Sequence, residues 1–306
     1  MKFISTMLLA VMLIASGHAQ KAKLHLNLEE GVSYKHITHS KANIAQDVYG
    51  MKMNIEVIMD ASMSFLVKAV SKEAYDMEIS YDWMKMNMEL PQTSMEFSSE
   101  KNDENDLFSL ILAEMKNMPL NLKMDKRGRI TEIEDVESRW DSIVDAFDQF
   151  PQDQREQVKS QLLNSYGGKA ISGSIETYTA IFPEKAVKKG AQWNTVLNLE
   201  SGMPFTLNST FTYEGSEGGL ALITSQGSLE SVETDEFIET NGMMMKYKLS
   251  GTMNSTIKVD KKSGWIQEAS TEQIVKGSSI IQANEQIPQD MTIPMTITSV
   301  TEISSD

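Results

Sequence analysis

The chain has 306 residues, no cysteine, and 43 acidic against 28 basic side chains, which gives a formal net charge of −15 at pH 7. This acidic balance argues against nucleic acid or an anionic membrane surface as a partner, because both would repel the chain. Without cysteine, a disulfide framework, thiolate catalysis and thiolate metal sites are excluded.

Residues 1–19 have the layout of a secretory signal peptide. Lys2 precedes an apolar run over residues 7–15, and small residues follow up to Ala19, where we expect cleavage. The run is shorter than the roughly 18 to 20 apolar residues that a membrane span needs, and no later segment reaches that length, so no transmembrane segment is predicted. We therefore expect the remaining chain to be exported, to the periplasm or outside the cell.

The first half of the exported chain alternates between apolar and polar side chains. From Met51 to Met59 the apolar side chains stand at odd positions, apart from Ile58. Period two between turn-forming residues is typical of half-buried antiparallel strands. The strands predicted in this half, in chain order, are residues 24–29 (paired with 33–38), 51–59, 62–70, 74–81 and 82–90.

Helical spacing appears only in the middle of the chain. Asp103 can cap a helix over about residues 104–117, whose apolar side chains share one face. Three more helices are predicted from apolar spacing and from proline and glycine positions. They cover residues 136–147, 151–167 and 171–182.

The second half returns to alternation. Its predicted strands are residues 191–200, 204–214, 218–231, 245–259, 264–276 and 291–304.

Two local patterns recur in the same order in both halves. LEEGVSY (28–34) matches VKKGAQW (187–193), and LKMDKRGRI (122–130) matches IKVDKKSGWI (257–266) with one residue inserted. Asp and Gly suit such turns, because Asp bonds the backbone ahead of it and Gly supplies a positive φ. The recurrence indicates that the two halves are related.

We predict a mainly β (α+β) protein with two related, curved antiparallel β-lobes and a central helical segment. The N-terminal lobe, with one inserted helix, covers residues 20–134. The helical segment covers residues 135–182, and the C-terminal lobe covers residues 183–306.

The segments FPEKAVKKGAQW (182–193) and KVDKKSGWIQEAS (258–270), together with the N-terminal layout, resemble a family of secreted proteins of similar length, found mainly in Bacteroidota and described as a domain of unknown function. This resemblance implies no activity and carries no catalytic residues. At the level of fold, the chain is also similar to periplasmic lipoprotein carriers. That similarity implies a strongly curved antiparallel sheet that cups helices and an apolar cavity.

The chain has no recognisable catalytic motif. GGKAIS (167–172) differs from a phosphate-binding loop, because Ala170 follows Lys169 and the segment lies between helices. We therefore predict a protein that is not an enzyme and that uses no cofactor.

Three histidines follow the signal segment. If residues 24–29 pair with 33–38, His25 and His36 face each other near Glu29, which is a start towards a zinc or copper site, whereas His39 points away. No third ligand is placed there, so two exposed strand histidines are favoured and no metal site is predicted.

Methionine is the most unusual feature, with 22 in the chain. Met84, Met86 and Met88 alternate, which places three sulfur atoms on one face of a strand, roughly 6.5 to 7 Å apart. Three interpretations stay open: an ordinary core, a deformable apolar lining for a ligand, or a Cu(I) site. An ordinary core is the favoured interpretation, and one observation points toward a lining, since well-specified cores use methionine sparingly. The candidate lining residues are Met51, Met53, Met84, Met86, Met88, Met243 and Met245.

The favoured function is an exported, non-enzymatic binding protein, specifically a carrier of an apolar or lipid-like molecule. The first alternative is an interaction protein of the cell envelope without a small ligand. The second is a periplasmic Cu(I)-binding protein that uses methionine clusters. The sequence does not indicate the oligomeric state.

Overall fold

The computed structural model describes residues 21–101, 103–201, 203–232, 237–240, 243–285 and 287–305. The predicted signal peptide, residues 1–19, lies outside the described residues.

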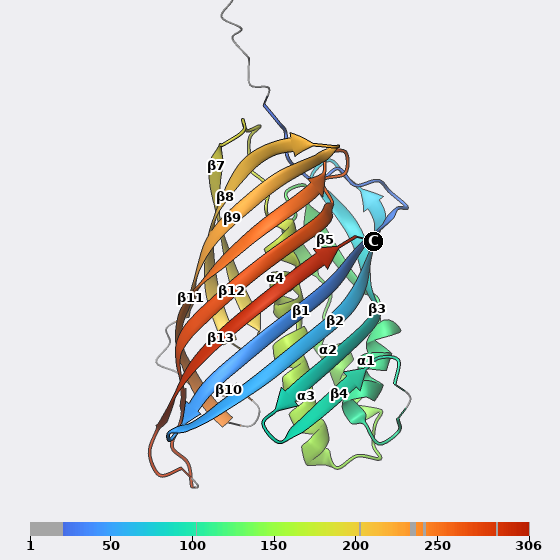
Figure 1. Cartoon of the computed structure of the whole chain (residues 1–306). Coiled ribbons are helices and arrows are strands. Elements are labelled where there is room, and N and C mark those ends of the chain that lie inside the picture. The colour runs from blue at the N-terminus through green and yellow to red at the C-terminus, as the bar shows by residue number, and fades with distance from the viewer. Residues whose placement is uncertain are drawn as a thin grey trace, which may run out of the picture.

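One antiparallel sheet of 13 strands forms the body of the described chain and curves around the helices (Figure 1). Its main path runs β6-β5-β3-β2-β1-β13-β12-β11-β9-β8-β7, while β4 pairs with β3 and β10 pairs with β11. The strands are β1 (Ser33–Val48), β2 (Met51–Val70), β3 (Ala74–Leu90), β4 (Thr93–Ser98), β5 (Leu120–Asp125), β6 (Ile130–Ile133), β7 (Gln192–Ser201), β8 (Met203–Glu217), β9 (Leu220–Ser231), β10 (Ile238–Thr240), β11 (Met243–Asp260), β12 (Ile266–Ile281) and β13 (Met291–Ser304). The helices are α1 (Leu107–Lys116), α2 (Glu137–Asp145), α3 (Gln152–Tyr166) and α4 (Gly168–Thr179).

The two halves of the sheet meet where β1 pairs with β13, from Ile37 opposite Ser304 to Gln46 opposite Met295. The predicted fold class, curved antiparallel β with a central helical segment, is confirmed. The two lobes are the halves of one continuous sheet, because an unpaired strand edge exposes backbone hydrogen-bonding groups that a neighbouring strand can satisfy.

The strands of the first half are longer than predicted. Residues 51–59 and 62–70 form the single strand β2, and residues 74–81 and 82–90 form β3. Asp82 is an extra residue in β3, since Trp83 pairs with Ser62 while Tyr81 pairs with Met63. This bulge keeps the apolar side chains before and after it on the same face of the sheet.

The strand predicted at residues 24–29 is wrong. This segment is extended but lies outside the sheet, with three leucines buried, and it crosses two hairpin turns. The Leu26 amide donates to the Lys126 carbonyl (3.0 Å), and the Asn27 amide donates to the Ser263 carbonyl (2.7 Å). The alternation is genuine, but the leucines face the core beneath these turns rather than a partner strand.

Those two hairpin turns belong to the recurring Asp–Gly pattern. Gly128 and Gly264 both have positive φ, +85° and +71°. A Cβ atom on Gly128 would lie 1.9 Å from the Thr179 carbonyl oxygen, and one on Gly264 would lie 2.2 Å from the His25 carbonyl oxygen. Each turn therefore requires glycine for its backbone conformation and for its close approach to a neighbouring chain segment.

The first helix starts later than predicted. Asp106 caps α1, since its carboxylate accepts from the Ser109 amide (3.1 Å), whereas Asp103 accepts from the Asn105 amide in the preceding turn (3.0 Å). Both acids suit a cap, and the apolar face that begins at Leu107 decides between them.

Three tryptophans connect the helical segment, the turns and the sheet through their indole N–H groups. The indole N–H of Trp140 donates to the Tyr166 carbonyl (2.9 Å), that of Trp193 to Ile181 (3.0 Å) and that of Trp265 to Lys35 (2.9 Å). Trp140 and Trp265 are fully buried. The helices thus lie fixed on the concave side of the sheet, where the candidate site is found.

Candidate functional site

A cavity of about 540 Å³ lies between the concave face of the sheet and helices α3 and α4. Its sheet wall comes mainly from β1, β2, β3 and β13, and its helix wall includes Tyr166, Ile171, Ile175 and Tyr178. The size is in the usual range for small-molecule sites, about 300 to 1,000 Å³.

Methionine dominates one part of the sheet wall. Met59 of β2 stands directly opposite Met86 of β3. Met84 lies one inward-facing position further along β3, and Met63 lies two further along β2, beyond Ala61. We call Met59, Met63, Met84 and Met86 the methionine wall; all four line the cavity. Met84 is 3% exposed, and the other three are half-buried.

Two of the seven predicted lining residues, Met84 and Met86, line the cavity. Strand register places all seven on the same face of the sheet, but five lie farther along their strands. Met88 stands between Val57 and Met95. Met51 is 66% exposed at the β1–β2 turn, and Met53 lines a separate hollow beside Met295.

Met243 and Met245 open strand β11, far along the sheet from the cavity. Met243 is 39% exposed. Met245 pairs with Ile281, and its sulfur lies 3.7 Å from the Tyr247 hydroxyl. Three other methionines, Met59, Met63 and Met203, line the cavity and were not among the predicted lining residues. Following the period of two from Met51 along the whole of β2 would have found Met59 and Met63.

His36 is buried, so the expectation of an exposed strand histidine is wrong for this residue. It is 6% exposed and lines the cavity. Its ring stacks on Trp265 with ring centres 4.6 Å apart, and it meets the edge of Phe65 at 5.0 Å. Burial lowers the pKa of His36 to about 4, so its imidazole is neutral at pH 7.

The three histidines do not converge. His39 lies on the opposite face, where its Nδ1 atom is 2.5 Å from an oxygen of Asp60, and the Nδ1 atom of His25 is 2.7 Å from the Leu26 carbonyl oxygen. Among the described residues, no three His, Cys, Asp or Glu side chains are grouped so that they could hold a metal ion.

Hydroxyl groups form a row next to the methionine wall. Ser40, Thr301, Thr271, Ser255 and Ser225 stand opposite one another on β1, β13, β12, β11 and β9; we call them the hydroxyl ladder. Ser40 bonds Thr301, and Ser255 bonds Thr271, both at 2.9 Å. The row begins at Met86 and Met59, since Met59 pairs with Ser40.

Tyrosines complete the polar part of the cavity. The Tyr178 hydroxyl from α4 bonds Thr271 and Thr301 of the hydroxyl ladder. Burial raises the pKa of Tyr81 and raises that of Tyr166 to about 12, so both phenols are neutral at pH 7. None of the described lining residues is Asp, Glu, Lys or Arg. The arrangement suits binding of a mostly apolar molecule.

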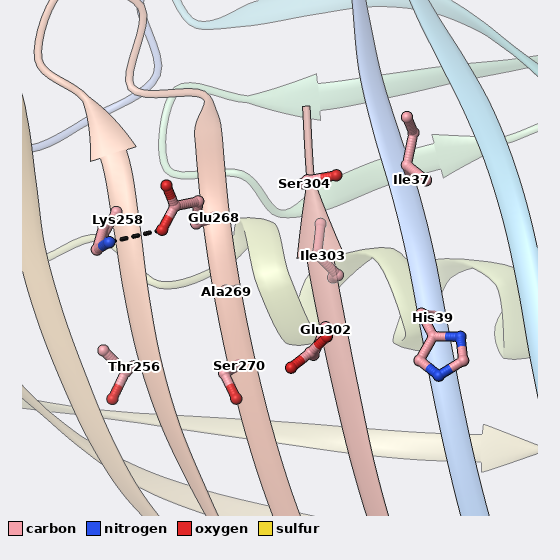
Figure 2. A pocket seen from close by; sticks show the side chains of 10 residues that line it. All are labelled: Ile37, His39, Thr256, Lys258, Glu268, Ala269, Ser270, Glu302, Ile303 and Ser304. Carbon is pink, nitrogen blue, oxygen red and sulfur yellow. Dashed lines mark hydrogen bonds and ion pairs between the residues drawn. The ribbon is translucent and has the colours of Figure 1, made fainter. Parts of the chain in front are cut away.

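A second hollow, of about 430 Å³, lies on the other face of the sheet, over β1, β13, β12 and β11. Figure 2 shows its lining, with Lys258 bonded to Glu268 and with Glu302 and His39 projecting from neighbouring strands. The Lys258–Glu268 distance is 2.5 Å. This polar, ion-paired lining contrasts with the uncharged cavity under the helices.

No helix among the described residues is long and apolar enough to cross a membrane.

Comparison with solved structures gives several remote likenesses. A structure titled "Lipid-protein interactions in lipovitellin" is 9% identical with a TM-score of 0.48; the match covers 92% of this chain and 25% of that one, so this chain spans about a quarter of it. A BenF-like porin from Pseudomonas fluorescens is 7% identical (TM-score 0.18, 90% and 100% covered). A DUF1329 family protein from Desulfovibrio piger is 9% identical (TM-score 0.15, 89% and 85% covered). These TM-scores are low, so none of the three establishes a shared fold.

No curated protein matches the chain. One family model matches residues 72–266, which is more than half of the chain; its description is "Family of unknown function (DUF6263)".

Proposed function

The chain belongs to the Family of unknown function (DUF6263), and for this member we propose an exported, non-enzymatic protein that binds and carries an apolar or lipid-like molecule. The observation that carries the proposal is the cavity of about 540 Å³ between the methionine wall and helices α3 and α4.

The chemistry of the lining supports binding of an apolar molecule. Methionine side chains are unbranched and polarizable, so they adapt to ligands of different shape. Ile171 and Ile175 of α4 and Phe65 of β2 add further apolar surface. Ser165 and Ser174 line the cavity and are exposed to solvent, which gives a ligand a route between the helices and the sheet.

Ligand content tests the proposal directly. Protein purified from its native host is extracted with organic solvent, and the extract is analysed by mass spectrometry. We expect a lipid-like molecule in an amount approaching one per chain. Finding no bound lipid in the wild-type protein contradicts the proposal.

A pair of variants connects the extracted molecule to the cavity. Ala61→Phe fills the cavity, since Ala61 lines it between Met59 and Met63, and we expect the extracted amount to fall severalfold. The matched control is Ile58→Phe on the opposite face of the same strand, which is expected to keep the wild-type amount. Equal loss in both variants would indicate a folding defect rather than a blocked site.

Two cross-strand pairs favour Cu(I) binding as a second candidate function. Met59 faces Met86 across β2 and β3, and Met63 faces His36 across β2 and β1, so soft thioethers and a neutral imidazole line one cavity. These are ligands that Cu(I) accepts. Metal analysis after anaerobic Cu(I) loading tests this candidate. We expect a variant with both Met59→Leu and Met86→Leu to bind no Cu(I).

A further inference from the structure

The polar groups of the cavity fall into two classes. Ser40, Thr301 and Tyr178 are hydrogen-bonded to one another or to the hydroxyl ladder. His36 is not: within the described chain, neither of its ring nitrogens has a hydrogen-bond partner, and its Nε2 atom is wholly buried. A buried polar atom without a partner is costly and uncommon in native structures, so His36 calls for an explanation.

His36 lies at the end of the cavity wall that is farthest from Met86. It stands directly opposite Met63, two residues along β1 from Thr38, with Trp265 stacked behind it. A neutral imidazole carries one N–H donor and one acceptor nitrogen. The Tyr81 hydroxyl, from the residue opposite Met63 on β3, also has no hydrogen bond within the described residues. One end of an otherwise apolar cavity therefore offers unused donors and an unused acceptor.

The same site has nothing that could neutralise a charged ligand. The described lining contains no acidic or basic side chain apart from His36. An isolated buried charge, of either sign, loses its hydration and gains no counter-charge here. A phosphate, carboxylate or ammonium head group at this end would be strongly disfavoured.

We propose that the cavity selects an uncharged amphiphile, whose apolar body lies along the methionine wall and whose hydroxyl or carbonyl group hydrogen-bonds to His36. The inference rests on the proposed carrier function and narrows its ligand class to neutral molecules such as long-chain alcohols and other uncharged lipids.

A chain-matched set of ligands tests this selection. The full exported chain is stripped of bound lipid and loaded with N-phenyl-1-naphthylamine, an uncharged apolar fluorophore. 1-Dodecanol, dodecanoate and dodecylammonium then compete with the fluorophore at pH 7, the alcohol below its solubility limit and each ion below its critical micelle concentration. We expect dodecanol to displace the fluorophore at a concentration at least about tenfold lower than either ion, because only the ions must bury an unpaired charge.

Substitutions at His36 assign the effect to that side chain. His36→Phe keeps a flat ring against Trp265 but removes both hydrogen-bonding nitrogens, and we expect dodecanol to bind about threefold to tenfold more weakly while the fluorophore binds as before. His36→Gln restores a donor and an acceptor and should recover the preference for the alcohol. The matched control is His39→Phe, the same substitution on the opposite face of the strand, which should change neither affinity.

The results separate this inference from the proposed function. If the fluorophore binds but either ion competes as well as dodecanol, or if His36→Phe leaves the dodecanol affinity unchanged, the head-group inference is wrong and the carrier function stands. If neither the fluorophore nor dodecanol binds, both are wrong. Thermal unfolding of each variant identifies any loss that comes from misfolding.

Discussion

The concave face of the sheet carries two kinds of wall. The methionine wall on β2 and β3 faces a cavity, while Leu197, Leu207, Leu229 and Leu249 on β7, β8, β9 and β11 form a leucine wall within a second buried cluster. Leu207 and Leu229 are each 1% exposed, whereas three of the four wall methionines are only half-buried. In these two walls the branched side chain stands where the neighbours are fixed, and the flexible one borders open space. Methionine is not confined to open space, since Met253 and Met295 are buried in the same cluster as the leucine wall.

The packing of α4 explains the difference. A Cβ atom on Gly173 would lie 3.5 Å from the Leu199 side chain and 3.6 Å from the Asn198 carbonyl oxygen, so the helix is close against β7. Towards β2 and β3 the space between helix and sheet is large enough to remain open. The helical segment is thus placed off-centre on the face, which leaves the cavity on one side.

Truncation to alanine should give the largest difference between the two walls in the free energy of unfolding. Leu207→Ala should lower the free energy of unfolding by about 2 to 5 kcal/mol, because it leaves a void in a filled cluster. Met86→Ala should cost less than half as much, since its side chain already borders open space. Urea denaturation of both variants measures the contrast, and equal losses would show that the methionine wall is ordinary core.

The next largest effect is a loss of stability at acidic pH, because His36, which lies beside the methionine wall, becomes protonated. Its pKa falls from 6.5 to about 4 on folding, so the unfolded chain binds the proton more tightly. The stability contributed by neutral His36 is present above pH 6.5 and is lost as the pH falls towards 4, by about 3 kcal/mol in all.

Comparing stability curves of the wild type and His36→Phe between pH 7 and pH 4 isolates this contribution. The wild type should lose about 3 kcal/mol more than the variant over that range. Parallel curves would mean that His36 reaches solvent when it is protonated.

A smaller effect is expected at the hydroxyl ladder, which lies between the two walls. Tyr178→Phe removes the bonds from α4 to Thr271 and Thr301 and should lower the free energy of unfolding by about 1 to 2 kcal/mol. Loosening of α4 should also speed release of a bound fluorophore, measured by stopped-flow displacement. An unchanged release rate would place the route of exchange away from this helix.

The smallest stability change is expected from exchanging the side chains themselves. Met84→Leu with Met86→Leu, and the reverse exchange Leu207→Met, should each stay within about 1.5 kcal/mol of the wild type. The walls should then differ in binding alone: the leucine substitutions should narrow the range of apolar ligands accepted. Calorimetry gives the stabilities, and fluorophore competition gives the range.

The sequence predicts most of the strands but not how they associate. Alternation predicts residues 291–304 as β13 with the bounds that the structure has, because that strand is apolar on one face only. The pairing of β1 with β13 joins segments about as far apart as the chain allows, and no local pattern specifies it. Alternation does not predict the bulge at Asp82 either. The bulge shifts the alternation by one residue but keeps the apolar side chains before and after it on one face of the sheet.

The candidate site, too, is predicted only in part from the sequence. The period of two places Met84 and Met86 on one face, which the structure retains. Whether that face meets packed side chains or a cavity depends on where α3 and α4 lie, which is decided by contacts such as that of Gly173 with β7. The sequence predicts an exposed His36, because no local pattern indicates that Trp265, more than 200 residues away in the chain, packs against it.

The pairing of β1 with β13 also constrains how the protein can fold. Ser40 and Thr301, which meet at the cavity, are separated by 261 positions in the chain. Contacts between such distant segments form slowly, because the entropy of closing the intervening loop is lost before the contact stabilises the structure. The β1–β13 pairing next to the cavity is therefore expected to form late in folding, so the cavity is expected to be among the last parts of the molecule to be completed.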